Sequence, residues 1–410
     1  MLPVDWLEAF AHIDADCFYA TCERARHPEL RKIPVCVLSS QEAIVVAKTY
    51  DAKAWGIVTG MPVWEARRLL PKATYLPADF HHYGLVSEQM FAILRRFSPE
   101  VEVYSIDEGF MGLKGLCSLW RKSYGGIADL IRETVSVEVG VTVSIGVSVT
   151  KTLAKIASES HKPNGTTVIP GRGIEAFLAG VKVGDIPGIG ENREALLHKF
   201  GIRTALQYVQ APQALIQRLL GRMGTDLWHE LRGIPLYPLE LEPKPPKSIA
   251  RTASLGMVTS DPDVLKAHLV HHVTRLTTEL VGKELLTGRV WVFLRRKSFE
   301  TSAAEARLHR LTASYQALCQ IAMEAYDRLY QEGELYRGCG VIAGDIFPAE
   351  GQTPDLFEGA RKEERQTRLV QTMDAINRRY GRGTLCRLAT LPLGEKRPGG
   401  RFHYPLLEME

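Results

Sequence analysis

The chain has 410 residues, of which 45% are hydrophobic and 24% are charged, a composition typical of about two to four folded globular domains. Its net charge of +4 excludes a histone-like tail, so any affinity for a polyanion must come from where the cations lie. The seven cysteines form no C-x-x-C pair, and no apolar run is long enough to cross a membrane. We therefore expect a cytoplasmic protein with reduced thiols and no membrane contact.

Strand-like and helical patterns alternate over the first 170 residues. The first apolar run, at 9–13, is followed by Asp14 and Asp16, so it predicts a buried strand that delivers carboxylates at its C-terminal end. Further strands are expected at 34–38, 43–47, 101–108 and 139–149, and a helix at 151–157. The runs at 34–38 and 43–47 flank a turn-prone segment and predict a small hairpin. The alternation indicates an α/β or α+β domain.

The rest of the chain divides into a helical block, a linker and a second domain. Residues 181–233 have a helical pattern, and five prolines within 235–246 predict an extended interdomain linker, because proline cannot continue a helix. The next domain combines strands and helices, which predicts helices on one face of a small sheet. Its expected helices are 262–284 and 314–332, and its expected strands are 289–294 and 338–346. After 348 we expect a mobile connector with short motifs and a small C-terminal appendage.

Positive charge is concentrated in the linker and the start of the second domain. Residues 244–310 hold twelve Lys and Arg against six Asp and Glu, a net charge of +6. This pattern indicates contact with a phosphate backbone, although a solvated cationic surface would have the same composition. The candidate contact residues are Lys244, Lys247, Arg251, Arg295, Arg296 and Lys297.

Two acidic sites far apart in the sequence are candidates for metal binding. One is Asp14, and the other is the pair Asp107 and Glu108 within YSIDEGF. Carboxylates in apolar strands are costly unless a cation neutralises them, although an acidic pair taken alone is also compatible with a surface turn. Mg²⁺ fits, because it binds one or two carboxylates together with substrate phosphates. Two such ions about 3.5–4 Å apart can drive an in-line phosphoryl displacement.

Three sequence blocks resemble the motifs of Y-family translesion DNA polymerases. They are HIDADCFYA at 12–20, YSIDE at 104–108 and SIGVSVTKTLAKIA at 144–157, which KPNG follows at 162–165. The resemblance extends over nearly the whole chain. FSPEVEVY at 97–104 and MDAINRRYGRGT at 373–384 are similar to the UmuC branch, the catalytic subunit of DNA polymerase V. Tyr50 and the KPNG turn are more similar to the DinB branch, DNA polymerase IV, so the branch stays open.

The resemblance implies an α+β multidomain fold, a right-hand polymerase with palm, small fingers, helical thumb and a separate little-finger α/β domain. The implied boundaries are palm 1–18 and 76–170, fingers 19–75, thumb 171–235, linker 236–247, little finger 248–347 and tail 348–410. It also implies template-directed, error-prone DNA synthesis across damaged templates, in DNA repair and SOS mutagenesis, without proofreading. The alternative from another class is a catalytically silent accessory protein that keeps the fold and binds DNA and the clamp.

The same resemblance implies a set of metal ligands and a steric gate. Asp14, Asp107 and Glu108 would hold two Mg²⁺ ions, with the backbone carbonyl of Ala15 as a further ligand. Tyr19, next to Phe18, falls at the gate position, where an aromatic ring collides with the 2′-hydroxyl of a ribonucleotide. Phe18 and Tyr19 as plain core aromatics are the structural alternative.

Further positions match contacts to the triphosphate of the incoming dNTP. Tyr50 would donate a hydrogen bond, and Lys53 and Lys162 would supply point charges. Lys53 stands where the DinB branch generally has arginine, and a lysine lacks the bidentate fork of a guanidinium group. The lysines at 151 and 155 are expected beside the same site or the primer backbone, with a solvated surface as the alternative.

Two short motifs resemble contacts to DNA and to a protein partner. IPGIG at 186–190, with Gly188 and Gly190, resembles a helix-hairpin-helix whose backbone amides approach a DNA phosphate. A plain helix-capping turn is the alternative there, and Glu194 stands where a small residue is more usual. The second motif resembles the peptide by which bacterial polymerases dock on the sliding clamp. Its anchor residues are Gln352, Asp355, Leu356 and Phe357.

The C-terminal tail carries the last implied partners. Residues 363–410 resemble the tail of UmuC. That likeness implies a UmuD′-like subunit and a recombinase filament as partners, beside primer-template DNA, a dNTP and the sliding clamp.

Overall fold

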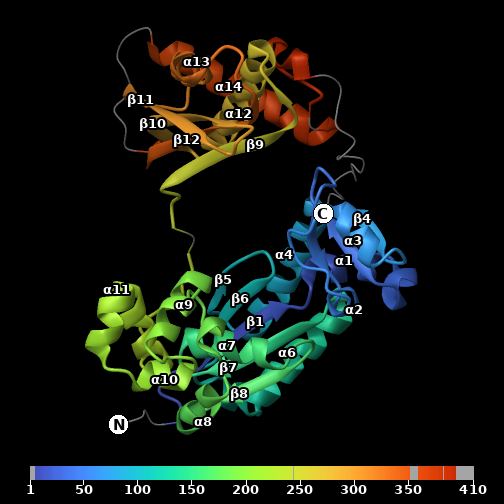
Figure 1. The fold of residues 1–410 in the computed structure, drawn as a ribbon, viewed down its shortest axis with the longest axis vertical. Helices are drawn as coiled ribbons and strands as arrows, with labels where there is room; N and C mark the ends of the chain where they lie inside the picture. Colours follow the sequence, from blue (N-terminus) through green and yellow to red (C-terminus); the bar gives the residue numbers. More distant parts are fainter. Residues whose placement is uncertain (1–4, 243, 351–358, 382, 394–410) are drawn as a thin grey trace. The chain divides into compact units, whose positions relative to one another are not determined.

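The computed structural model describes residues 5–242, 244–350, 359–381 and 383–393. The chain forms two units, Met1–Pro243 and Lys244–Glu410, each with its own hydrophobic core (Figure 1). Within the described ranges, no helix is both long and apolar enough to span a membrane. The expected clamp peptide at 352–357 lies outside the described residues.

A five-stranded sheet of order β5-β6-β1-β7-β8 forms the centre of the first unit. Its strands are β1 (Phe10–Ala15), β5 (Val101–Val103), β6 (Glu108–Gly112), β7 (Val143–Ser148) and β8 (Thr166–Ile169). Strand β1 is antiparallel to both of its neighbours, whereas β7 and β8 are parallel. The strand expected at 139–149 begins only at Val143, because Val139 ends a helix that Gly140 caps at φ +79°.

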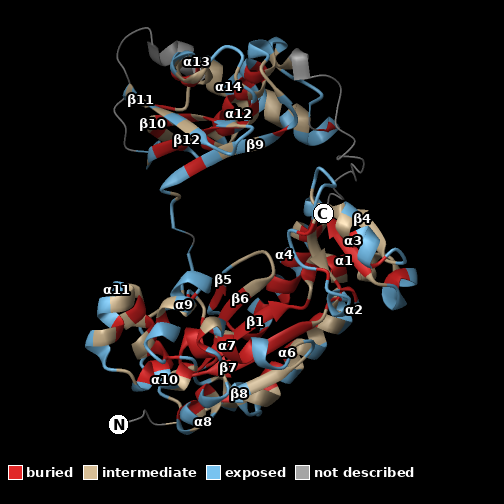
Figure 2. Cartoon of the chain, viewed as in Figure 1, coloured by how far each residue is buried: buried red, intermediate tan, exposed pale blue. Residues whose placement is uncertain are grey.

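The two faces of this sheet differ in chemistry, because successive strand residues point to opposite sides. Ala11 and Ile13 of β1 are fully buried in the core that contains α4 (Phe80–Phe97) and α6 (Tyr124–Val139). His12 and Asp14 lie on the other face, which α7 (Lys151–Ser160) covers. Figure 2 shows that buried residues predominate along the central strands. One strand thus supplies both the core and a polar face.

A second, three-stranded sheet has the order β3-β2-β4. The expected hairpin is confirmed, since β2 (Val35–Leu38) and β3 (Val45–Lys48) are antiparallel. Strand β4 (Thr74–Pro77) adds a parallel partner to β2 and extends this sheet past the expected finger boundary at 75. The helices of this part of the chain are α1 (Phe18–Arg26), α2 (Tyr50–Ala54) and α3 (Val63–Leu69), with a 3-10 turn at Pro28–Lys32.

The helical block is confirmed, and its core is continuous with α7. Its helices are α8 (Ile174–Ala179), α9 (Glu191–Lys199), α10 (Ala205–Gln210) and α11 (Gln213–Leu231). Gly221, at φ +66°, kinks α11 in a conformation that favours glycine. The remaining short elements of the unit are α5 (Leu116–Trp120) and 3-10 turns at Gly171–Gly173 and Val183–Asp185.

The linker is extended as expected, but its first half is bound to the first unit. The Glu230 carboxylate accepts hydrogen bonds from the amides of Leu236 and Tyr237, at 2.6 and 3.1 Å. The Glu102 carboxylate accepts one from the Glu240 amide at 2.9 Å. Two buried carboxylates therefore use the backbone amides that an extended chain leaves unpaired. The sequence predicted the extended conformation but not these hydrogen bonds to the first unit.

The second unit contains a four-stranded antiparallel sheet of order β11-β10-β12-β9. Its strands are β9 (Ser248–Thr259), β10 (Leu285–Arg296), β11 (Thr301–Thr312) and β12 (Tyr336–Pro348). The expected helices are confirmed as α12 (Pro262–Gly282) and α13 (Tyr315–Leu329), which pack on the buried side of the sheet. The sequence did not predict β9 and β11, because small and polar residues dominate both strands.

The tail forms more regular structure than the sequence predicted. Helix α14 (Gly359–Tyr380) contacts α12, and Val370 on it is buried. The Ser314 hydroxyl donates a 2.6 Å hydrogen bond to Gln366, and the Arg387 guanidinium lies 3.4 Å from the centre of the Tyr315 ring. A 3-10 turn follows at Leu388–Leu393. The sequence predicted a mobile connector and a small C-terminal appendage here but not this helix, because its polar composition hid the side that packs.

Candidate active site

The pairing of β1 with β6 brings the two acidic segments together. Asp14 lies directly opposite Glu108 in the antiparallel register, so the two side chains share one face of the sheet. The Ala15 amide donates a 2.9 Å hydrogen bond to the Asp107 carbonyl and continues the ladder. Asp14 is only 5% exposed. Carboxylates that are distant in sequence therefore meet where both strands reach one edge of the polar face.

A histidine that the sequence analysis did not select completes this group. His12, Asp14 and Glu108 each present one donor atom, and these atoms all lie within 4.8 Å of one another. The signal was available, because residues two apart in a strand share a face. The Asp107 carboxylate accepts a 2.6 Å hydrogen bond from Ser105 instead, and it lies outside this group of three.

Two lysines neutralise the acids. Lys162 Nζ lies 2.5 Å from Asp14 Oδ1, and Lys155 forms an ion pair with Glu108. Burial raises the pKa of Asp14 to about 7, although Lys162 acts in the opposite direction. Burial also disfavours the charged form of Glu108, but the neighbouring His12 and Lys155 side chains outweigh this effect and lower the pKa of Glu108 to about 2. Burial lowers the pKa of His12 to about 4, so its imidazole is neutral at pH 7.

Gly146 allows α7 to reach this site. It is the partner of His12 across the β1–β7 ladder. A Cβ atom at this position would lie 2.1 Å from the Ala154 carbonyl oxygen and 2.3 Å from the Ser158 amide. Only glycine leaves room for the helix backbone at that distance. The close approach brings Lys155 over the sheet and onto Glu108.

The KPNG turn is anchored by the second aspartate of the first motif. Asp16 accepts hydrogen bonds from the Ser144 hydroxyl and the Asn164 amide, both at 2.8 Å. A Cβ atom on Gly165 would lie 1.9 Å from the His161 carbonyl oxygen, so this turn also requires glycine. Asp16 thereby holds the segment that carries Lys162 over Asp14.

The gate candidate Tyr19 is braced by other aromatic rings. Its ring stacks on Tyr83 at 4.5 Å and meets Phe80 edge-on at 5.6 Å. Burial raises the pKa of Tyr19, and the Asp107 charge adds to this shift, which places the ring near that carboxylate. Phe18 is 3% exposed and belongs to the core. The structure therefore separates the pair into one braced, half-buried ring and one core ring.

The other two triphosphate candidates, Tyr50 and Lys53, lie together on α2. Tyr50 begins α2, and Lys53 Nζ lies 5.9 Å from the centre of its ring. Burial raises the pKa of Tyr50, and nearby Asp16 adds to the shift. Lys48 was not selected from the sequence, yet burial and the charge of Lys53 lower its pKa. Lys48 could have been selected from the sequence by its position at the end of β3, two residues before Tyr50.

Comparison with known proteins shows the family to which this chain belongs. The impB/mucB/samB family model matches residues 13–159, and the model of that family's C-terminal domain matches residues 246–356. Protein ImpB of Salmonella typhimurium is 31% identical over 383 residues, which are 90% of this chain and 90% of that protein. The chain is a Y-family DNA polymerase of the impB/mucB/samB family. It is a DNA-directed, error-prone polymerase of the translesion class.

Both branches named by the sequence resemblance are among the similar proteins. DNA polymerase IV of Dehalococcoides mccartyi strain BAV1 is 30% identical and covers 90% of this chain and 94% of its own. DNA polymerase IV 1 of Bacillus subtilis is 29% identical, with 95% and 94% covered. A Dbh–Dpo4–Dbh polymerase chimera matches with a TM-score of 0.70, and an insertion ternary complex of Dbh DNA polymerase with 0.58. These structures, 23% and 22% identical, each cover 83% of this chain and 99% of their own.

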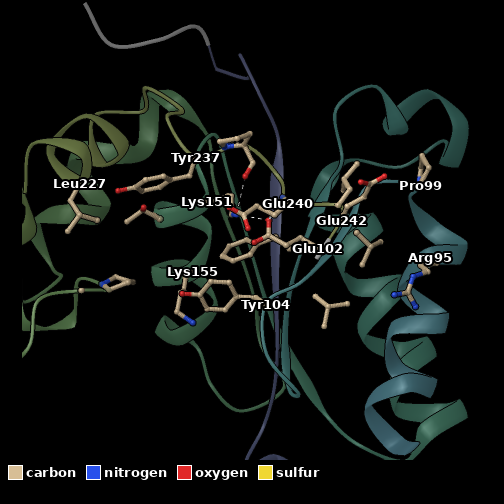
Figure 3. Close-up of a pocket in the computed structure, with 18 of the residues that line it drawn as sticks. Arg95, Pro99, Glu102, Tyr104, Lys151, Lys155, Leu227, Tyr237, Glu240 and Glu242 are labelled. Carbon is tan, nitrogen blue, oxygen red and sulfur yellow. Dashed lines mark hydrogen bonds and ion pairs between the residues drawn. The ribbon is translucent and has the colours of Figure 1, made fainter. Parts of the chain in front are cut away.

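A cleft of about 930 Å³ lies within the first unit, and Lys155, the partner of Glu108, is among the residues that line it. Strands β5 and β6, helix α7, the loop before α9, helix α11 and the bound half of the linker line it. Figure 3 shows Tyr237 and Leu227 above Lys155 and Tyr104, with Arg95 and Pro99 on the right-hand side of the view. Lys151 and Glu102 form a 2.5 Å ion pair in its wall. The cleft thus opens directly onto the helix that carries Lys155.

The expected DNA contacts of the thumb lie in a tight loop. Gly188 has φ +90°, a conformation that favours glycine, and it lines the cleft. Gly190 is the N-cap residue of α9. Arg193 donates a 2.6 Å hydrogen bond to the Gly188 carbonyl, which rigidifies the loop. Both glycines therefore shape the approach to one helix N-terminus.

The expected cations of the second unit differ in their surroundings. Lys244, Lys247, Arg295 and Lys297 are exposed. Arg251 is half-buried and forms an ion pair with Glu279 of α12. Arg296 pairs with Glu300 at 3.1 Å and also donates to Gln331 at 3.0 Å. Arg251 and Arg296 thus form ion pairs inside the unit, and their contact with DNA stays a prediction.

Proposed function

We propose that this polymerase extends a primer by two-metal nucleotidyl transfer at Asp14, Asp107 and Glu108. The observation that carries the proposal is the register that sets Asp14 opposite Glu108 beneath two lysines. The burial that raises the Asp14 pKa to about 7 supports it, because such a carboxylate is ionised fully only beside a cation. Oxygen donors of this kind suit Mg²⁺.

The chain's own groups would act as ligands and positioning contacts. Asp14, Asp107 and Glu108, with the carbonyl of Ala15, would hold two Mg²⁺ ions. Bound ions supply Lewis-acid activation of the primer 3′-hydroxyl and charge stabilisation of the departing pyrophosphate. The Ser105 hydrogen bond fixes the rotamer of Asp107 beside the strand pair.

The incoming dNTP would be held by cations and one tyrosine. Lys162 releases Asp14 and takes the triphosphate, while Lys53 adds charge and Tyr50 donates a hydrogen bond. Tyr19, backed by Phe18 and stacked on Tyr83, would exclude the 2′-hydroxyl of a ribonucleotide. The stacking supports this role, because a braced ring cannot swing away from the sugar.

A primer-extension assay with Mg²⁺ and an undamaged template tests the proposal. The wild type should add deoxynucleotides, and Asp107→Ala should reduce the rate by at least about 10²–10³-fold. Tyr19→Ala should keep dNTP incorporation and raise the ratio of ribonucleotide to deoxyribonucleotide incorporation. No extension by the wild type, matching Asp107→Ala, would instead identify a catalytically silent accessory protein.

Primer-template DNA, the sliding clamp and a UmuD′-like subunit complete the proposal as partners in the cytoplasm. The exposed cations Lys244, Lys247, Arg295 and Lys297 support phosphate contact by the second unit. The clamp proposal rests on Gln352, Asp355, Leu356 and Phe357. Gel filtration of the polymerase mixed with the clamp tests this proposal. The wild type should elute as a complex with the clamp, and the double variant Leu356→Ala and Phe357→Ala should not. A pull-down with and without residues 363–410 tests the UmuD′-like subunit and the recombinase filament.

A further inference from the structure

The ammonium group of Lys155 lies in a seat made of three different groups. It pairs with the Glu108 carboxylate, lies 3.5 Å from Nε2 of His12 and is 5.3 Å from the centre of the Tyr104 ring. A carboxylate, an imidazole lone pair and an aromatic face each attract a cation. Figure 3 shows Lys155 beside Tyr104 at the edge of the cleft. These three groups, which form the seat, therefore make a binding position for one positive charge.

His12 presents a lone pair to this seat. The Ser158 hydroxyl donates to the Lys155 carbonyl at 2.8 Å, so its oxygen accepts the hydrogen of His12 Nδ1, also at 2.8 Å. A hydrogen on Nδ1 leaves Nε2 as an acceptor. The His12 side chain is fully buried, so bulk water does not compete for that nitrogen. The orientation set by Ser158 thus makes His12 a cation acceptor.

The backbone under the seat cannot move easily. Helix α7 touches the sheet at Gly146, as described above. Its first turn is fixed by the Glu230 carboxylate, which accepts a 3.2 Å hydrogen bond from the Thr152 amide. The side chain of Lys155, by contrast, is 20% exposed. Its ammonium group can therefore leave the seat only by side-chain rotation towards the cleft.

We propose that Lys155 is the counter-ion that Glu108 exchanges for a divalent metal ion, and that His12 is the positioning residue that seats it. The ammonium group and a metal ion both bind the Glu108 carboxylate, so they compete for it. This inference rests on the proposed function, because the competing ion is the one that the catalytic acids would hold. Lys155 then weakens metal binding by the free enzyme, and it releases Glu108 only when metal ions occupy the site.

Mn²⁺ binding to the full chain without DNA or nucleotide measures this competition. Free Mn²⁺ is read by electron paramagnetic resonance during a titration at fixed pH and low salt. Lys155→Met keeps the length of the side chain and removes the charge, so it should tighten Mn²⁺ binding about tenfold. Lys114→Met, which removes an exposed lysine paired with Glu8 beyond the other end of β6, is the matched control and should change nothing. Equal or weaker binding by Lys155→Met overturns the proposal.

A separate variant distinguishes this failure from failure of the proposed function. Asp14→Asn removes a ligand that both ideas require, so it should weaken Mn²⁺ binding. If Asp14→Asn binds Mn²⁺ as the wild type does, the metal site is elsewhere and the proposed function fails together with this inference. If Asp14→Asn weakens binding and Lys155→Met does not tighten it, only the exchange at Glu108 is wrong.

Two variants at His12 test the positioning role. The side-chain oxygen of Gln can occupy the place of Nε2, whereas Asn can replace only the Nδ1 donor to Ser158. His12→Asn should therefore loosen the seat and tighten Mn²⁺ binding severalfold, while His12→Gln should keep the wild-type affinity. Combined with Lys155→Met, neither should have a further effect. Weaker binding by His12→Asn, at an unchanged thermal unfolding temperature, would make His12 a metal ligand and overturn the inference.

Discussion

The two units contain very different kinds of buried residue. In the first unit the buried set includes six charged residues: Asp14, Asp16, Glu23, Glu102, Lys151 and Glu230. Among the described residues of the second unit, the buried polar set is limited to His272, Thr277, Thr287 and Thr312. Burial of a charge is costly unless every charge has partners. In the first unit these buried charges have partners, and through them they fix the positions of neighbouring segments.

Each buried charge near the cleft holds a particular segment. Glu102 pairs with Lys151 and binds the linker at the Glu240 amide. Glu230 accepts hydrogen bonds from the amides of Thr152 and Leu236, so it ties α7 and the linker to the end of α11. The second unit needs no such ties, because its sheet and two helices are joined by apolar packing. Buried charge therefore marks the part of the molecule that must position a reaction.

The largest expected effect on stability is at the buried ion pair. Lys151→Met leaves Glu102, whose side chain is 7% exposed, without its cation. The first unit should lose about 3–5 kcal/mol of unfolding free energy. Urea unfolding followed by tryptophan fluorescence measures this loss, because Trp291 is the single tryptophan of the second unit. A loss below 1 kcal/mol would contradict the idea that this charge holds the unit together.

The next effect compares a glycine in each sheet. Gly146→Ala forces a Cβ atom against the backbone of α7, whereas a Cβ atom on Gly344 would meet only the Trp291 side chain, at 2.4 Å. Gly146→Ala should cost about 3 kcal/mol, and Gly344→Ala about 1 kcal/mol. Hydrogen exchange read separately for the two units measures both. Gly146→Ala should also slow primer extension, because a displaced α7 disturbs the face of the sheet on which His12 and Asp14 lie; equal costs for the two variants would refute the comparison.

Acid should destabilise the second unit through His272, which is buried. Burial, and then the charges of His271, His268, Arg275 and Arg251, lower the pKa of His272 to about 3, and both of its ring nitrogens lack a hydrogen-bond partner. The unfolded chain therefore binds the proton first, so stability is lost as the pH falls below about 6.5 and continues to fall towards 3, by at most about 1.4 kcal/mol per pH unit.

His272→Leu should remove this dependence of stability on pH. The control is His309→Gln, which replaces an exposed histidine of β11 and should keep the dependence. Hydrogen exchange of the second unit at pH 7 and pH 5.5 reads the difference. Parallel acid sensitivity in His272→Leu and the wild type would show that other groups control the pH dependence.

The smallest effect is expected at an ion pair that water still reaches. Arg251 and Glu279 are 30% and 19% exposed, so Arg251→Met should cost at most about 1 kcal/mol. Added salt should reduce the difference between variant and wild type, since solvent-accessible charges are screened. Equilibrium unfolding of both proteins at low and high salt measures it. A loss as large as that of Lys151→Met would remove the distinction between the two units.

Much of the fold followed from hydrophobic pattern. The helices α12 and α13 and the hairpin of β2 and β3 were predicted, because their apolar spacing is strong. Strands β9 and β11 were missed, because their packing face is built largely from small or partly buried residues. Helix α14 was missed because its polar composition suggests a tail, whereas its packing on α12 is a tertiary contact.

The sequence by itself determined which residues could carry chemistry: Asp14, Asp107 and Glu108 stand out as acids in apolar strands, and Lys162 and Tyr19 belong to motifs that resemble one polymerase family. Only the tertiary structure decided which groups surround them. Lys155 reaches Glu108, and Ser158 reaches His12, because Gly146 lets α7 lie against the sheet. His12 on β1 and the two residues of α7 are far apart in the chain, and local pattern carries no information about such a meeting.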